Sequence, residues 1–288
     1  MNASFQTLKS QYRSALKRFA ESTKNLEVVT SLPLEPRQSS AGPEVVYVLD
    51  SSFNPPTFAH RRIASSAILE NLGKPARLLL LLATQNADKP SKPASFEDRL
   101  IMMQLFAQDL LAFLRSELPA ADQESIPVID IGITKKPYFV DKATEIESVG
   151  IYSPGLEQVH LTGYDTLIRI FNSKYYPPDH TLQPLEPFIS KHRLRVTMRP
   201  DSEWGSRGEQ EAYLANIAQG GRENEGAKPE WAQRIKLVEG KKPEEKSVSS
   251  TRAREAVHTK PEDLEWLVPQ DVQGFILSAR PYAEKTPI

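Results

Sequence analysis

Residues 45–63 read VVYVLDSSFNPPTFAHRRI, and they connect an apolar strand, a polar turn and the start of a helix. The VVYVL run is apolar and rich in β-branched residues, which is typical of a strand covered on both faces of a parallel sheet. Pro55 and Pro56 restrict the backbone of the turn, and His60 follows shortly after. This order places backbone amides at the carboxyl end of a strand, a geometry suited to binding phosphates.

Short apolar runs alternate with amphipathic stretches along the rest of the chain. This alternation predicts an α/β fold, a doubly wound, Rossmann-like parallel sheet with helices on both faces. We predict strands at 45–49, 77–83, 127–133, 158–162, 194–198 and 235–238. We predict helices at 60–71, 95–116, 139–149, 165–173, 184–190, 208–218, 249–258, 261–266 and 269–279.

The composition excludes several classes of function. The chain has 288 residues and a formal net charge of −1, so its overall charge does not indicate a nucleic-acid partner. It has no cysteine, which excludes disulfides, thiolate metal sites and a cysteine nucleophile. No apolar run approaches the length that crosses a bilayer, so no membrane partner is predicted. The geometry of residues 45–63 instead favours a small-molecule ligand that carries phosphate.

The first 43 residues differ from the remainder. We predict an amphipathic N-terminal helix and a linker rich in Pro, Ser and Gly over 1–43, and the main domain over 44–288. Residues 1–20 contain four basic residues and no acidic one. Such a helix can be a mitochondrial transit peptide or can pack on the domain, and we favour packing. The expected location is therefore the cytoplasm, the nucleus or both, with mitochondrial import as the alternative.

A second motif, VSSTRAR at 248–254, opens a helix nearly two hundred residues after the first. Three consecutive hydroxyls, on Ser249, Ser250 and Thr251, lie at the expected helix N-terminus, and Arg254 follows one turn later. Free amides, the helix dipole and a guanidinium together attract anions. Either motif alone could be an ordinary capped helix, but the pair indicates a phosphate site with two walls.

The two motifs together resemble the signatures of the nucleotidylyltransferase superfamily, and within it those of nicotinamide-nucleotide adenylyltransferases. Further segments agree in order: DK at 88–89, FEDRLIM at 96–102, PYFVDKA at 137–143, LTGYDTL at 161–167 and LVPQDV at 267–272. The resemblance extends from about residue 44 to about residue 282. The extension before it resembles the fungal branch related to the promoter-of-filamentation protein.

The resemblance implies transfer of AMP from ATP to a mononucleotide phosphate, with release of pyrophosphate and no covalent intermediate. It implies that ATP is a substrate and that Mg²⁺ accompanies it, although the sequence shows no cluster of metal ligands. The implied catalytic residues are His60, Thr57 and Arg254. The candidate nucleotide-binding residues are Ser52, Phe53, Asn54, Lys89, Arg99, Gly163, Asp165, Arg199, Ser249, Ser250 and Thr251.

The chain departs from the family pattern in two places that matter. Ser51 stands where the family usually has glycine. The segment at 133–137 lacks the Trp-Glu pair that often recognises the nicotinamide ring, so Tyr138 and Trp204 become the candidates for binding the acceptor. A different acceptor, ATP hydrolysis, or a catalytically weak nucleotide-binding interaction protein are therefore alternatives. The two intact phosphate motifs favour an enzyme. The sequence makes no prediction about oligomeric state or protein partners.

Overall fold

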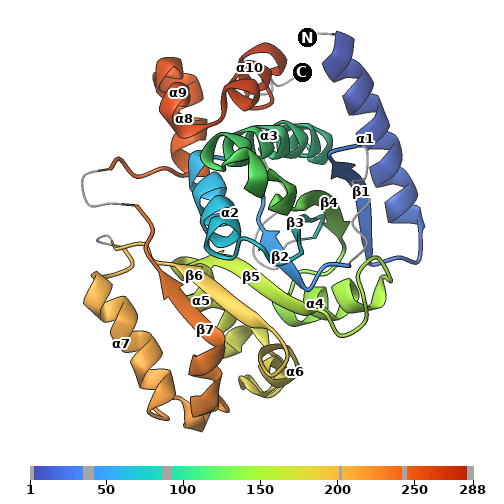
Figure 1. Ribbon diagram of the computed structural model, residues 1–288. Helices are drawn as coiled ribbons and strands as arrows, with labels where there is room; N and C mark the ends of the chain where they lie inside the picture. Colours follow the sequence, from blue (N-terminus) through green and yellow to red (C-terminus); the bar gives the residue numbers. More distant parts are fainter. Residues whose placement is uncertain (1–2, 35–41, 86–92, 201–202, 242–244, 284–288) are drawn as a thin grey trace.

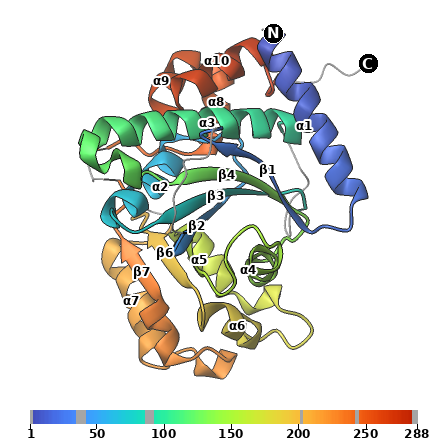
Figure 2. The ribbon, with the colours of Figure 1, turned by 45° about the vertical axis from the view of Figure 1, so that its right-hand side comes forward.

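The computed structural model describes residues 3–34, 42–85, 93–200, 203–241 and 245–283. A seven-stranded sheet forms its centre, as Figures 1 and 2 show from two directions. The strands are β1 (Leu26–Leu32), β2 (Val45–Asp50), β3 (Ala76–Ala83), β4 (Val128–Thr134), β5 (Glu157–Gly163), β6 (Arg193–Thr197) and β7 (Ile235–Val238). Their order across the sheet is β1-β4-β3-β2-β5-β6-β7. All neighbours are parallel except β1 and β4.

Helices cover both faces of the sheet. The α-helices are α1 (Ala3–Glu21), α2 (Phe58–Glu70), α3 (Phe96–Glu117), α4 (Phe139–Ser148), α5 (Tyr164–Ile170), α6 (Glu186–Ile189), α7 (Arg207–Ala218), α8 (Ser250–Thr259), α9 (Leu264–Leu267) and α10 (Gln270–Ala279). Short 3₁₀ turns are η1 (Ala120–Ser125), η2 (Ser173–Tyr175), η3 (Gln183–Leu185), η4 (Glu223–Glu225), η5 (Pro229–Arg234) and η6 (Pro261–Asp263). The sequence prediction of an α/β doubly wound fold is confirmed.

Strand β2 shows how the sequence assigns side chains to the two faces. Val45, Tyr47 and Leu49 pack into the core cluster that includes α2, α3 and α10, whereas Val46 and Val48 pack with α4 on the other face. Successive side chains of a strand point to opposite faces, so an apolar run with no polar interruption is needed where both faces are covered. The central strand is therefore anchored on both sides up to Asp50, where polar residues begin.

The N-terminal region contributes more to the sheet than the sequence prediction included. Strand β1 was not predicted, and it pairs antiparallel with β4 at the sheet edge, where Leu26 lies opposite Thr134. An edge strand has one neighbour and needs less apolar surface, which explains its weaker signal. Helix α1 packs on α3, where the Tyr12 hydroxyl donates to Gln104 over 2.6 Å, and its Phe19, which is 1% exposed, belongs to the core cluster that contains α3.

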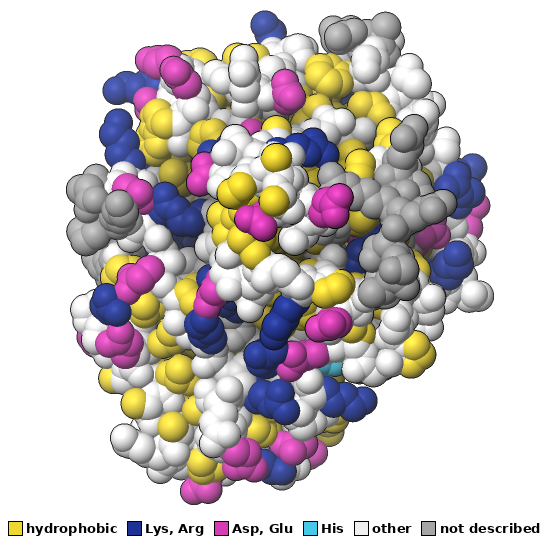
Figure 3. All heavy atoms as spheres, in the orientation of Figure 1, with side chains coloured by type: hydrophobic (Ala, Val, Ile, Leu, Met, Phe, Trp, Pro, Cys, Tyr) yellow, Lys and Arg dark blue, Asp and Glu magenta, His cyan; other side chains and the backbone are white. Residues whose placement is uncertain are grey.

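The helix ends follow from local sequence. Ser95 caps α3, because its hydroxyl accepts a bond of 3.2 Å from the Asp98 amide. The helix predicted at 261–266 is the 3₁₀ turn η6 followed by the short α9. Among the described residues, no helix combines the length and apolar character needed to cross a membrane. Figure 3 shows acidic and basic side chains interspersed over one face, which agrees with the near-zero net charge.

Candidate active site

A cavity of about 550 Å³ opens beyond the carboxyl ends of β2 and β5. The strand order reverses between these neighbours: β3 and β4 follow on one side of β2, while β5 and β6 follow on the other. Connections from β2 and β5 leave toward opposite sides at such a switch point, and the gap between them is where open α/β sheets bind ligands. The cavity walls come from the segment after β2, the start of α4, α5, α3 and α8.

His60 lies in the first turn of α2, one hydrogen bond from the cavity. The Thr57 amide donates to its Nδ1 over 3.0 Å, and its Nε2 lies 3.0 Å from the hydroxyl of Ser51, which lines the cavity. An amide can only donate, so Nδ1 is the acceptor and Nε2 carries the proton. The Nε2 proton is therefore directed at Ser51 and, beyond it, at the cavity.

The environment of His60 keeps the ring neutral. Burial lowers the pKa of His60 to about 4. The rings of Phe53 and Phe106 lie at centroid distances of 5.4 and 6.4 Å from the imidazole. Phe53 is itself fully buried and has a positive φ of 43°, an uncommon conformation for a non-glycine residue. A neutral imidazole with a fixed tautomer suits a hydrogen-bond donor and not a proton acceptor.

The two sequence motifs meet in the structure. Arg254 donates from Nη1 to the Asn54 carbonyl over 2.7 Å, and Ser250 donates from its hydroxyl to the Pro55 carbonyl over 2.7 Å. Arg254 also donates to the Thr251 hydroxyl over 3.1 Å. The start of α8 is thus bonded directly to the turn that follows β2. Residues of both motifs line the cavity, namely Asn54, Ser250, Thr251 and Arg254.

A second guanidinium faces the same end of the cavity. Arg99 in α3 is 1% exposed, donates from Nε to the Ala94 carbonyl over 3.1 Å and lies 5.2 Å from the Phe96 ring centroid. Burial lowers the pKa of Arg99, and the charge of Arg254 lowers it further. Within the described parts of the chain, neither guanidinium forms an ion pair with a carboxylate. Two cations without a carboxylate partner favour an anionic ligand between them.

Residues 163–165 form the wall beyond β5. Asp165, in the first turn of α5, lines the cavity. A Cβ atom on Gly163 would lie 2.6 Å from Asp165 Oδ1, so glycine at the strand end is what lets this carboxylate adopt its position. Of the two predicted residues, Asp165 lies in the cavity wall and Gly163 directly precedes α5.

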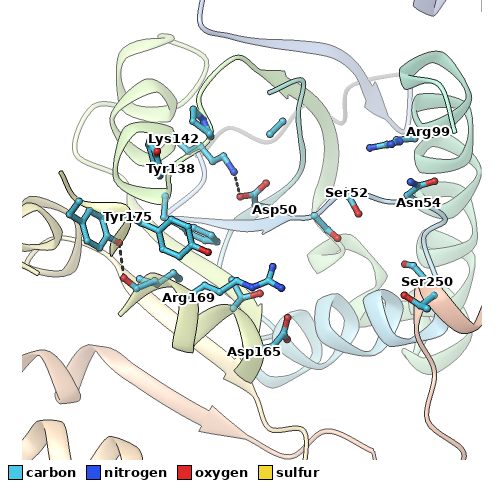
Figure 4. Close-up of a pocket in the computed structure, with 18 of the residues that line it drawn as sticks. Asp50, Ser52, Asn54, Arg99, Tyr138, Lys142, Asp165, Arg169, Tyr175 and Ser250 are labelled. Atoms are coloured by element: carbon cyan, nitrogen blue, oxygen red, sulfur yellow. Dashed lines mark hydrogen bonds and ion pairs between the residues drawn. The ribbon is translucent and has the colours of Figure 1, made fainter. Parts of the chain in front are cut away.

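The opposite end of the cavity is formed by Tyr138, Lys142 and Asp50, which Figure 4 places away from Arg99, Asn54 and Ser250. Tyr138 is the residue that precedes α4 and is 36% exposed. Lys142 forms an ion pair with Asp50, and their side chains are 6% and 9% exposed. This end therefore combines an aromatic ring with a buried ion pair.

Several predicted residues lie elsewhere. Thr57 is fully buried and contacts His60, with its hydroxyl 2.9 Å from Nδ1, so it orients the imidazole from behind the cavity wall. Ser249 is the N-cap of α8 and accepts from the Arg252 amide over 3.2 Å. Arg199 and Trp204 lie outside the cavity lining: the Arg199 amide bonds to Gln210, and Trp204 packs against the core cluster of α5, β6 and α7. Lys89 lies outside the described residues.

Sequence reasoning missed Asp50, Lys142, Arg169 and Tyr175, all of which line the cavity. Asp50 carried a usable signal, because it is a polar residue at the carboxyl end of an apolar strand. Lys142 also had a recognisable sequence signal, because it lies on the same face of α4 as the buried Ala143 and Ile146. A lysine at an inward-facing helix position requires a partner or a ligand.

The described residues contain no group of three or more His, Asp or Glu side chains that could hold a metal ion. Mg²⁺ in nucleotide enzymes is usually bound by substrate phosphates and water with one or two carboxylates, so it needs no such protein cage. Among the described residues that line the cavity, two have carboxylates: Asp50, which pairs with Lys142, and Asp165. The residues are thus compatible with a cation that arrives bound to a triphosphate.

Comparison with known proteins gives one close relative and several similar folds. The chain is 34% identical over 276 residues to the "Putative nicotinamide mononucleotide adenylyltransferase" of Schizosaccharomyces pombe, covering 96% of this chain and 98% of that one. No protein-family model matches the chain. The fold is similar to that of Plasmodium falciparum nicotinic acid mononucleotide adenylyltransferase in complex with NaAD, with a TM-score of 0.50 and 13% identity over 83% of this chain and 97% of that chain.

Proposed function

Because the chain belongs to the family of nicotinamide mononucleotide adenylyltransferases, we propose that it transfers the adenylyl group of ATP to nicotinamide mononucleotide, forming NAD and pyrophosphate. The observation that carries this proposal is the pair of hydrogen bonds from α8 to the turn after β2. They bring Ser250, Thr251 and Arg254 into one cavity with Ser52 and Asn54. The amides, hydroxyls and guanidinium of the two motifs can therefore act on the same anion.

Binding of ATP follows from the charges in the cavity. The triphosphate would lie between Arg99 and Arg254, which both line the cavity and are close enough for the charge of Arg254 to lower the pKa of Arg99. The free amides at the start of α8 and the positive end of its helix dipole add to this attraction. We propose that Mg²⁺ enters with the triphosphate, bound by phosphate oxygens and water. When bound, it would neutralise charge that develops on the leaving pyrophosphate.

The transfer itself would be direct. A phosphate oxygen of the acceptor attacks the α-phosphorus of ATP, a new P–O bond forms, and the bond to the β-phosphate oxygen breaks. Positioning and charge stabilisation are the main protein contributions to such a reaction. Arg254 would hold the leaving pyrophosphate. His60 would donate its Nε2 proton toward Ser51, whose hydroxyl can then donate to a phosphate oxygen in the cavity.

The direct test is an assay of purified protein with ATP, Mg²⁺ and nicotinamide mononucleotide, in which NAD and pyrophosphate are measured separately. Arg254→Ala should reduce both products. Arg252→Ala is the matched control, because Arg252 lies in the same helix turn but is exposed and bonds to the Ser247 carbonyl. Formation of ADP or AMP without NAD would contradict the proposed function and favour ATP hydrolysis.

We also propose that the protein acts in the cytoplasm or nucleus. The packing of α1 on α3 supports this, because removal of a transit peptide would strip residues such as Phe19 from the core. Microscopy of the full chain beside a chain beginning at Glu21 tests the proposal. Mitochondrial localisation of the full chain only would overturn it.

A further inference from the structure

The ion pair of Asp50 and Lys142 lies in the cavity wall, and the transfer chemistry described above does not use it. Asp50 is the last residue of β2, and Lys142 lies one turn into α4. Both side chains are almost fully buried and both line the cavity, on the side away from the phosphate-binding end (Figure 4). Burying two charges is costly, and apolar residues of similar size often serve stability equally well. A structural role alone therefore explains this pair poorly.

The pair keeps hydrogen-bonding capacity for a ligand. Lys142 Nζ donates to Asp50 Oδ2. This bond uses one of three ammonium protons and one of two carboxylate oxygens. A ligand in the cavity thus meets an acceptor and a donor side by side, on a pair whose charges cancel.

A primary carboxamide matches this arrangement. Its NH₂ group can donate to the Asp50 carboxylate while its carbonyl oxygen accepts from the Lys142 ammonium. A carboxylate at the same place offers no proton to Asp50 and adds a like charge beside it, which is unfavourable. The pair would thus accept nicotinamide and disfavour nicotinate.

The neighbouring aromatic residues suit the ring that carries the carboxamide. Tyr138 lines the cavity one turn before Lys142, whose amide donates to the Tyr138 carbonyl over 3.0 Å. Phe139 also lines the cavity, with its ring centroid 5.4 Å from Lys142 Nζ. A pyridine ring bonded to ribose is cationic, and cations bind to aromatic faces. One short segment therefore supplies both an aromatic surface and the polar pair.

We propose that Asp50 and Lys142 determine acceptor specificity by binding the carboxamide, so that nicotinamide mononucleotide is preferred over nicotinic acid mononucleotide. This inference rests on the proposed adenylyl transfer. It assigns acceptor recognition to two residues that replace the tryptophan and glutamate missing from 133–137.

The test compares kcat/KM for the two mononucleotides in the full-length protein with ATP and Mg²⁺. Wild type should favour nicotinamide mononucleotide. Asp50→Asn frees the ammonium to bind a carboxylate, so the ratio should shift toward nicotinic acid mononucleotide by roughly tenfold or more. Lys142→Gln should shift the ratio further toward nicotinamide mononucleotide, because the Asp50 charge then lacks its counter-ion and repels a carboxylate more strongly. The KM for ATP should change little in both variants.

Glu145→Gln is the matched control. Glu145 also lies on α4 and pairs with Lys136 at 3.8 Å, but it does not line this cavity. The ratio of kcat/KM values for the two mononucleotides should be the same in Glu145→Gln as in wild type. Melting temperatures identify variants that fail to fold. Calorimetry of wild type with each mononucleotide compares the two affinities directly and does not depend on the variants.

Equal use of the two mononucleotides by wild type, or equal ratios in wild type and Asp50→Asn, would overturn the inference while leaving adenylyl transfer intact. If wild type forms a dinucleotide from neither mononucleotide, the proposed function fails and this inference fails with it. A shift in opposite directions in the two variants is not expected from a purely structural ion pair, which would lower both activities together.

Discussion

Replacement of His60 by alanine tests the central element of the proposed mechanism. The imidazole has a fixed orientation, with Nδ1 bonded to the Thr57 amide at 3.0 Å and Nε2 at 3.0 Å from the Ser51 hydroxyl. Its pKa of about 4 leaves only about one ring in a thousand protonated at pH 7. The neutral Nε2–H is therefore the active form, and turnover should show no decline as the pH rises through 6.5.

The expected loss can be bounded. Removing one donor that stabilises a developing negative charge typically lowers kcat by roughly 10²–10³-fold. The Ser51 hydroxyl stays in the cavity after the His60→Ala change, so we expect the lower end, about 10²-fold. The loss should appear in kcat, with a small change in the KM for ATP, because the interaction strengthens in the transition state.

Steady-state kinetics of His60→Ala, Ser51→Ala and the double variant provide the assay. Because the two residues are proposed to act as one unit, the double variant should lose little more than either single variant. The His60→Gln variant, which retains an N–H donor, should keep part of the activity. Unchanged turnover in His60→Ala would refute the assigned role, and fully additive losses would refute the hydroxyl-mediated contact.

Three further predictions concern binding and stability. Arg254→Ala should lower kcat/KM for ATP roughly ten- to hundredfold in steady-state assays, because a charged hydrogen bond contributes about 1.5–3 kcal/mol, and an unchanged value would contradict its phosphate role. Phe19→Ala should lower the free energy of unfolding by about 3–5 kcal/mol in denaturant titration, whereas the exposed Lys17→Ala should not. Burial lowers the pKa of His160 to about 3 and also lowers that of His192. The folded protein then binds fewer protons than the unfolded chain below about pH 6.5, so stability should be full above that pH and fall by about 1.4 kcal/mol per pH unit for His160 as the pH drops toward 4, with a further loss in the same direction from His192. A melting temperature that is constant from pH 7 to pH 5 would contradict this.

The sheet and the phosphate-binding end could be predicted because their signals are local. An apolar run such as 45–49, short and rich in β-branched residues, indicates a strand covered on both faces, and the structure extends it by one residue to Asp50. The hydroxyls at 249–251 mark a helix start by their chemistry alone, and α8 begins at Ser250. In both places the residues that indicate the element are adjacent in the sequence.

The acceptor end could not be predicted as well, because its contacts depend on tertiary packing. Lys142 and Asp50 are 92 residues apart, and neither residue type indicates the other in sequence. The prediction that Trp204 binds the acceptor depended on tertiary packing in the same way. An aromatic loop residue can reach a cavity or fill a core, and Trp204 packs against the cluster of α5, β6 and α7. Strand β1 was missed for a related reason, since its partner β4 is a hundred residues away and only the pairing makes it a strand.

Two adjacent residues at the end of β2 connect the two ends of the cavity. Asp50 contacts Lys142 on α4, whereas Ser51 contacts His60 on α2, and these helices lie on opposite faces of the sheet. Side chains that alternate along a strand reach opposite sides, so neighbours in sequence serve different parts of the substrate. Changes at Ser51 should then lower turnover for every acceptor alike, whereas changes at Asp50 should alter the ratio between acceptors. The end of β2 would thus fix both the side chain near the reacting phosphate and the side chain near the ring of the acceptor. A shift of the strand by one residue would exchange the positions of Asp50 and Ser51.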